Sequence, residues 1–125
     1  MTLNNMHVAR RRDWSDGTPI VLLGPGGVGK STLGRGLSKR LGWELIDLDA
    51  LFCEMVGNIG EVISGSGYDH YRIENLNLAE RRFEEISAPA IFVTSSGFLS
   101  APQDSEDFAR ASRLAQRGYG ITLLP

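Results

Sequence analysis

Residues 24–31, Gly-Pro-Gly-Gly-Val-Gly-Lys-Ser, have the composition and spacing of a loop that can hold a phosphate chain. They fit the pattern G-x-x-x-x-G-K-[ST] in full. Glycines let successive backbone N–H groups converge on phosphate oxygens, and the start of a following helix favours the same negative charge. In this arrangement Lys30 reaches the β- and γ-phosphates, and the Ser31 hydroxyl ligates Mg²⁺. The residues expected to contact a nucleotide are Gly24, Gly26, Gly27, Val28, Gly29, Lys30, Ser31 and Thr32.

The segments on either side of this loop predict a strand before it and a helix after it. The apolar run at 20–23 predicts a buried strand over 19–23. Leucines recur every four residues between 31 and 41, which predicts a helix with one apolar stripe that ends at Gly42. A strand, a glycine-rich loop and a helix in this order are the context that a phosphate-binding loop requires.

Strand and helix patterns alternate through the rest of the chain. Further strands are expected at 44–47, 89–93 and 120–124, and helices at 50–56, 59–63 and 68–86, with a loop at 64–67. Ser100 and Gln103 have capping-box spacing and predict the start of a last helix that ends at Gly118. This alternation predicts a parallel sheet in a layered α/β domain over 18–125, preceded by a flexible extension at 1–17.

Length, charge and cysteine content exclude several other classes of protein. The 125 residues fit one domain, and a net charge of −2 gives no basic surface for a nucleic acid or a membrane. No apolar run approaches the roughly 18 residues of a membrane-spanning helix. Because Cys53 is the single cysteine, an internal disulfide is excluded, which fits a cytoplasmic location. We interpret Cys53 as a small buried hydrophobic residue. His7 and His70 are isolated, so side chains alone are not expected to form a metal site.

Asp47, Asp49 and Arg72 are the other residues whose types suit chemistry on a phosphorylated ligand. A carboxylate that follows a strand beside the loop can orient an acceptor hydroxyl, and an arginine can grip a carboxylate with two parallel hydrogen bonds. On spacing alone the two aspartates fit a helix N-cap and a turn equally well, and Arg72 fits an exposed helix position. The residues alone leave these alternatives open.

From about residue 19 to 125 the sequence resembles the shikimate kinases. Residues 29–42 fit GKST-x-GR-x-L-x-x-x-LG, and residues 47–49 fit D-x-D. Residues 67–72 stand at a helical G-E-x-x-F-R segment, and residues 95–97 stand at a triple glycine that ends a strand. The resemblance implies a P-loop fold of the nucleoside-monophosphate-kinase type, with three α/β/α layers. It also implies transfer of the γ-phosphate of ATP to a hydroxyl of shikimate, a small-molecule substrate.

The roles of the family's site residues follow from this resemblance, position by position. Lys30 stabilises charge on the transferring phosphoryl group. Asp47 organises Mg²⁺ together with Ser31. Asp49 binds the acceptor hydroxyl and assists its deprotonation, and Arg72 holds the acceptor's carboxylate.

The acceptor side departs from the family's pattern at several positions. Ser95, Ser96 and Gly97 form the turn expected to bind the substrate, where the family has three glycines. The two serines either crowd the pocket or supply new hydroxyl donors. Tyr68 and Asn75 stand where the family has glutamates. These differences keep open a kinase for another hydroxylated small molecule, such as gluconate.

The end of the sequence also differs from the family. The resemblance implies a mobile lid with an arginine, a further strand and a last helix after the fourth strand. The sequence ends at Pro125, so we expect the lid and the last strand to be absent and one flank of the sheet to be unpaired. This keeps open a third alternative, a non-catalytic regulatory module that binds a nucleotide or another ligand. A monomer is the expected assembly.

Overall fold

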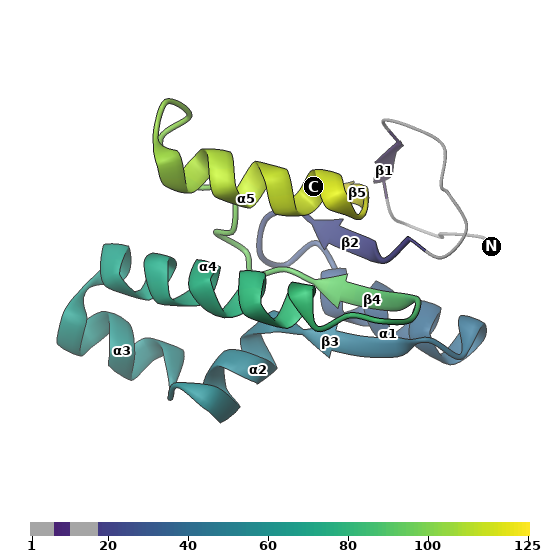
Figure 1. The fold of residues 1–125 in the computed structure, drawn as a ribbon, viewed down its shortest axis with the longest axis horizontal. Helices are drawn as coiled ribbons and strands as arrows, with labels where there is room; N and C mark the ends of the chain where they lie inside the picture. Colours follow the sequence, from purple (N-terminus) through teal and green to yellow (C-terminus); the bar gives the residue numbers. More distant parts are fainter. Residues whose placement is uncertain (1–6, 11–17) are drawn as a thin grey trace.

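The computed structural model describes residues 7–10 and 18–125, which form one five-stranded sheet with helices on both faces (Figure 1). The strands are β1 (His7–Arg10), β2 (Ile20–Leu23), β3 (Glu44–Asp47), β4 (Ala90–Val93) and β5 (Tyr119–Leu124). The helices are α1 (Lys30–Leu41), α2 (Leu48–Met55), α3 (Ile59–Ser66), α4 (Tyr68–Glu84) and α5 (Glu106–Arg117). The strand order is β1-β5-β2-β4-β3. Strands β2 to β5 pair in parallel, which confirms the predicted α/β fold class.

Alternate residues of the central strands face two separate cores. Leu22 and Val93 point to the face that α1 covers with its buried leucines, Leu33 and Leu37. Val21, Phe92 and their neighbours point to the other face, where α2, α4 and α5 pack. A buried parallel strand has to be apolar on both sides, which explains the continuous apolar runs of β2 and β4.

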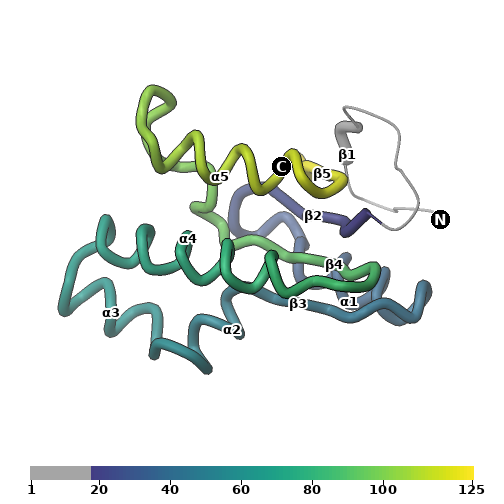
Figure 2. Tube along the Cα trace, in the orientation of Figure 1, coloured from purple at the N-terminus to yellow at the C-terminus, as the bar shows by residue number. Residues whose placement is uncertain are grey.

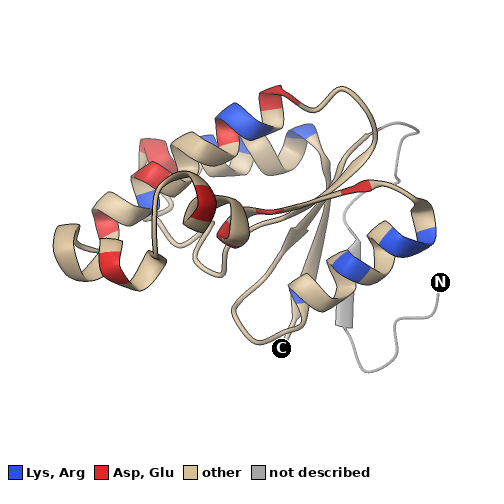
Figure 3. Ribbon diagram, turned by 90° about the horizontal axis from the view of Figure 1, so that it is seen from below, with Lys and Arg blue, Asp and Glu red and all other residues tan. Residues whose placement is uncertain are grey.

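The helices that cover the sheet lie along its two faces. The trace turns back after α3, so that α3 packs along α4 (Figure 2). The charged residues of α1 are all Lys or Arg (Figure 3). Two of them, Lys39 and Arg40, lie in its last turn, where they oppose the negative end of the helix dipole. Within the described part of the chain, no helix is long and apolar enough to span a membrane.

The start of α5 differs from the prediction. The expected capping residue, Ser100, donates instead to the Gly97 carbonyl oxygen at 2.7 Å and closes a turn. Helix α5 begins six residues later at Glu106, where the Ser105 hydroxyl accepts a hydrogen bond from the Phe108 N–H at 3.1 Å. Ser105 also donates to a carbonyl oxygen, that of Pro102 at 2.6 Å, so a hydroxyl can donate to one group and still cap a helix. The spacing of Ser100 and Gln103 alone does not reveal which serine starts the helix.

Two further local predictions are wrong. The expected loop at 64–67 is mostly helical, because α3 continues through Ser66 and ends at Gly67, which has φ 91°. Cys53 is exposed, not buried, since α2 turns Leu48 and Phe52 to the core. Both errors come from short helices, whose few residues give a weak periodic signal.

The outer edge of β5 is paired, contrary to the expectation of an unpaired flank. Strand β1 lies antiparallel to β5, with His7 opposite Leu124 and Arg10 opposite Ile121. Residues 7–10 therefore belong to the sheet, although their sequence predicts a flexible extension. The rest of that prediction, for residues 1–6 and 11–17, lies outside the described residues.

The contact between α1 and the sheet yields a test with a matched control inside one helix. A Cβ added at Gly34 would lie 2.6 Å from Val93 Cγ2 and 3.3 Å from Leu45 Cδ1, whereas one added at Gly36 would meet no atom within 4 Å. We expect Gly34→Ala to lower the free energy of unfolding by about 1–3 kcal/mol, because the buried valine cannot move aside. We expect Gly36→Ala to raise it by about 0.5–1 kcal/mol through helix propensity. Equal effects in urea denaturation would contradict this packing.

Candidate nucleotide and acceptor site

The glycine-rich loop connects the end of β2 to the first turn of α1. Gly24, Gly27 and Gly29 have positive φ angles of 138°, 80° and 90°, which side chains other than glycine rarely adopt. At Gly24 a Cβ would also lie 2.6 Å from the Leu123 carbonyl oxygen. These angles turn the chain into the helix start, where free backbone N–H groups favour an anion.

Lys30 holds this loop through its side chain. The residue is 8% exposed, and its Nζ donates to the carbonyl oxygens of Gly24 at 2.7 Å and Pro25 at 3.0 Å. Burial lowers the pKa of the ammonium group, while the charges of Asp49 and Asp47 oppose that shift. The ammonium therefore lies beside the loop backbone, where phosphate oxygens would compete with the two carbonyls for its hydrogen bonds.

Asp47 caps a helix and also contacts the loop serine. Its Oδ1 accepts from the Asp49 N–H at 3.1 Å and caps α2, while its Oδ2 accepts from the Ser31 hydroxyl at 3.0 Å. A hydroxyl and a carboxylate are the hard oxygen donors that Mg²⁺ prefers, so these residues fit the predicted metal site. No group of three or more His, Cys, Asp or Glu that could hold a metal occurs in the described ranges. Phosphate and water oxygens would therefore have to complete the coordination.

A cavity of about 280 Å³ lies over the loop and brings separate segments together. Its lining includes Gly26, Gly27, Gly29, Lys30, Ser31, Thr32, Asp49, Thr94 and Ser96. Of the other predicted nucleotide residues, Gly24 lines a neighbouring cavity with Ser95, and Val28 packs against the core beneath α1. The structure thus places Asp49 and Ser96 beside the loop, as expected for residues at the carboxyl ends of parallel strands.

A chain of hydrogen bonds holds Asp49 in place. The Ser95 hydroxyl donates to Asp49 Oδ1 at 2.6 Å and accepts from Asn75 Nδ2 at 2.9 Å. Ser95 and Asn75 are 3% and 4% exposed, so this part of the chain is buried, whereas Asp49 at its end is exposed. Burial raises the pKa of the nearby Tyr71 phenol, and its hydrogen bond with Ser95 opposes that shift. The serine that replaces a family glycine is therefore the hydrogen-bond partner of the predicted catalytic carboxylate.

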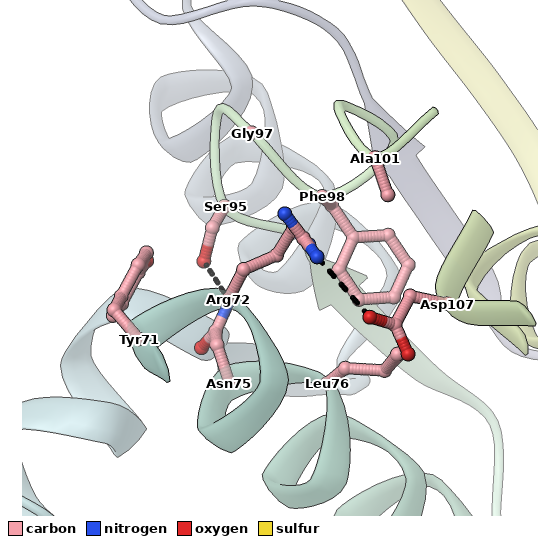
Figure 4. A pocket seen from close by; sticks show the side chains of 9 residues that line it. All are labelled: Tyr71, Arg72, Asn75, Leu76, Ser95, Gly97, Phe98, Ala101 and Asp107. Carbon is pink, nitrogen blue, oxygen red and sulfur yellow. Dashed lines mark hydrogen bonds and ion pairs between the residues drawn. The ribbon is translucent and has the colours of Figure 1, made fainter. Parts of the chain in front are cut away.

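Arg72 lies in a pocket next to Asp49 and pairs with two carboxylates. Its guanidinium donates to Asp107 Oδ2 at 3.1 Å (Figure 4). It also donates to Asp69 Oδ1 at 2.8 Å. The hydrogen bond with Asp107 is the main cause of the raised pKa of Arg72. The sequence did not indicate Asp107, because it lies 35 residues from Arg72 and outside any motif.

Gly97, the last residue of the predicted substrate turn, lies directly against the side chain of Tyr68. A Cβ at Gly97 would collide with the Tyr68 hydroxyl, which lies 3.1 Å from the Ser100 hydroxyl. Tyr68 therefore packs directly over this turn and fixes its position relative to α4. The arrangement brings the cavity over the loop, an oriented carboxylate and an arginine to one edge of the sheet, which suits phosphoryl transfer to a hydroxyl.

Comparisons with known proteins agree with this geometry. The family model of shikimate kinase matches residues 26–113. A shikimate kinase of Geobacter sulfurreducens is 41% identical over 91 residues, which cover 72% of this chain and 49% of that protein. A pentafunctional AROM polypeptide of Clavispora lusitaniae is 28% identical over 109 residues, which cover 87% of this chain and 7% of that protein.

A solved structure supports the fold. The shikimate kinase of Acinetobacter baumannii in complex with shikimate superimposes with a TM-score of 0.72 and 24% identity, covering 84% of this chain and 55% of that one. The chain spans about half the length of the shikimate kinases it matches. Since the family model covers more than half of these residues, the chain belongs to the shikimate kinase family.

Proposed function

We propose that this chain carries the core of a kinase that transfers the γ-phosphoryl group of ATP to a hydroxyl of shikimate. The observation that carries the proposal is the position of Asp49, which lines the phosphate cavity and is held from behind by Ser95. Membership of the shikimate kinase family supports the reaction class. The related structure from Acinetobacter baumannii, described as a complex with shikimate, supports the acceptor.

The proposed transfer uses residues that already lie at one edge of the sheet. Lys30 exchanges its two loop carbonyls for phosphate oxygens and stabilises the charge of the transferring group. Ser31 and Asp47 would hold Mg²⁺, which neutralises part of the phosphate charge when bound. Asp49 accepts the hydroxyl proton as the acceptor oxygen bonds to the γ-phosphorus and the bond to ADP breaks.

The acceptor turn gives a specific reason to test further substrates. Ser96 is exposed and lines the cavity over the loop, whereas the buried Ser95 hydroxyl already donates to Asp49. The Ser96 hydroxyl is therefore an added group for a hydroxylated acceptor and is compatible with one other than shikimate. We also propose a cytoplasmic location, because Cys53 is a free and exposed thiol, which suits a reducing compartment.

The first test of this function measures ADP release in a coupled assay with ATP, Mg²⁺ and a panel of hydroxylated acids. We expect release that depends on shikimate. We expect Asp49→Asn to lower kcat by about 100-fold or more, because the proton acceptor is lost. The control Asp104→Asn changes an exposed aspartate outside the site and should leave kcat unchanged.

Three other results of this assay would contradict the proposal in different ways. Release with a different acid would make the acceptor assignment wrong. Nucleotide binding without any acceptor-dependent release would favour a regulatory module. Full activity in Asp49→Asn would remove Asp49 from the mechanism.

A second test compares the only two lysines of the chain, Lys30 and Lys39. We expect Lys30→Met to weaken MgADP binding by about 10- to 100-fold, which is the value of a charge-assisted hydrogen bond to phosphate. Lys39→Met, in the last turn of α1, should leave the dissociation constant unchanged. Isothermal titration calorimetry measures both, and circular dichroism checks that each variant is folded. Equal affinities would show that the nucleotide does not contact Lys30.

A further inference from the structure

The pocket expected to hold the acceptor's carboxylate already contains a carboxylate of the protein itself. Asp107, from the first turn of α5, pairs with Arg72 at 3.1 Å across the pocket drawn in Figure 4. The side chains of Arg72 and Asp107 are 17% and 24% exposed, so solvent screens this pair only in part. The free volume of the pocket is about 10 Å³, which is room for one water molecule.

The guanidinium of Arg72 already uses both of its terminal nitrogens in ion pairs. One terminal nitrogen donates to Asp107 and the other to Asp69, whose side chain is 85% exposed. The remaining nitrogen, Nε, is buried and has no hydrogen-bond partner within the described residues. A carboxylate that enters the pocket therefore competes with Asp107 for the guanidinium, because Asp107 pairs with its charge and fills the adjoining space.

A second cation lies close to Asp107 and would pair with its carboxylate if that carboxylate left Arg72. Arg110 NH1 lies 3.7 Å from Asp107 Oδ1, one turn further along α5. The position of Asp107 at the start of α5 also favours its negative charge through the helix dipole. Release from Arg72 therefore leaves the carboxylate partly compensated, so an anionic ligand can displace it.

We propose that Asp107 is a specificity-determining residue of the acceptor pocket, which competes with the acceptor's carboxylate for Arg72 and so lowers affinity for acids but not for neutral analogues. The proposal rests on the proposed acceptor site but not on turnover. It makes Asp107 part of the acceptor pocket, although it lies on a different helix from Arg72 and outside any motif.

The test measures ligand binding to the full chain saturated with MgADP, by nuclear magnetic resonance titration. The ligands are shikimate, its neutral methyl ester, and cyclohexanecarboxylate, which keeps the ring and the acid without the hydroxyls. We expect Asp107→Asn to bind both acids about tenfold more tightly, because a neutral amide competes less well for the guanidinium. The methyl ester should bind both proteins equally. The control Asp104→Asn, an exposed position just before α5, should change no affinity.

The outcomes separate this inference from the kinase proposal. In one outcome, Asp107→Asn binds cyclohexanecarboxylate more tightly than the unmodified protein does, and neither protein binds or phosphorylates shikimate. The inference then stands, and the acceptor assignment fails. If Asp107→Asn is folded and neither acid gains affinity, Asp107 does not compete, and the inference is overturned. A weaker binding of both acids would overturn it too, since Asp107 would then be holding Arg72 ready for the ligand.

Discussion

The parallel pairing of β2, β4 and β3 is the constraint on which the rest of the site depends. Leu22 and Asp47 each pair with Val93, so the three strands end at the same edge of the sheet. The glycine loop, the aspartates and the serine turn each follow one of these ends. Because all three strands are anchored in two apolar cores, the points from which these segments start are fixed relative to one another.

Local patterns were sufficient to predict the strand–loop–helix unit that carries the loop. The loop motif and the apolar run before it correctly placed β2 and α1, and the motif predicts that Lys30 and Ser31 contact a nucleotide. The position of Asp47 was also predictable, although its spacing fitted a helix N-cap as well as a role in the site. In the structure one carboxylate oxygen caps α2 and the other accepts from Ser31, which is compatible with both roles.

The acceptor side was less predictable because its contacts join distant segments. Asn75 lies 20 residues from Ser95, and Asp107 lies 35 residues from Arg72, so no local spacing connects them. Strand β1 was missed for a related reason: a short polar segment becomes a strand only through its partner, β5. The two serines that depart from the family's glycines could be noticed in the sequence, but their hydrogen bonds could not.

The polar residues that differ from the family's pattern on the acceptor side lie together in the structure. Asn75 supports Ser95, Ser95 supports Asp49, and Tyr68 packs over Gly97 in the same turn. The Asn75 carbonyl oxygen is buried without a partner in the described chain, which costs on the order of 1–3 kcal/mol. A cost of this size at a pocket wall is more readily explained by a role in the site than by stability alone.

The most direct measurement is a crystal structure of this chain with MgADP and shikimate bound. The account predicts ADP phosphates in the loop with Lys30 turned from the Gly24 and Pro25 carbonyls, and a shikimate hydroxyl within hydrogen-bond distance of Asp49. ADP bound away from the loop, or shikimate bound away from Asp49 and Arg72, would contradict it.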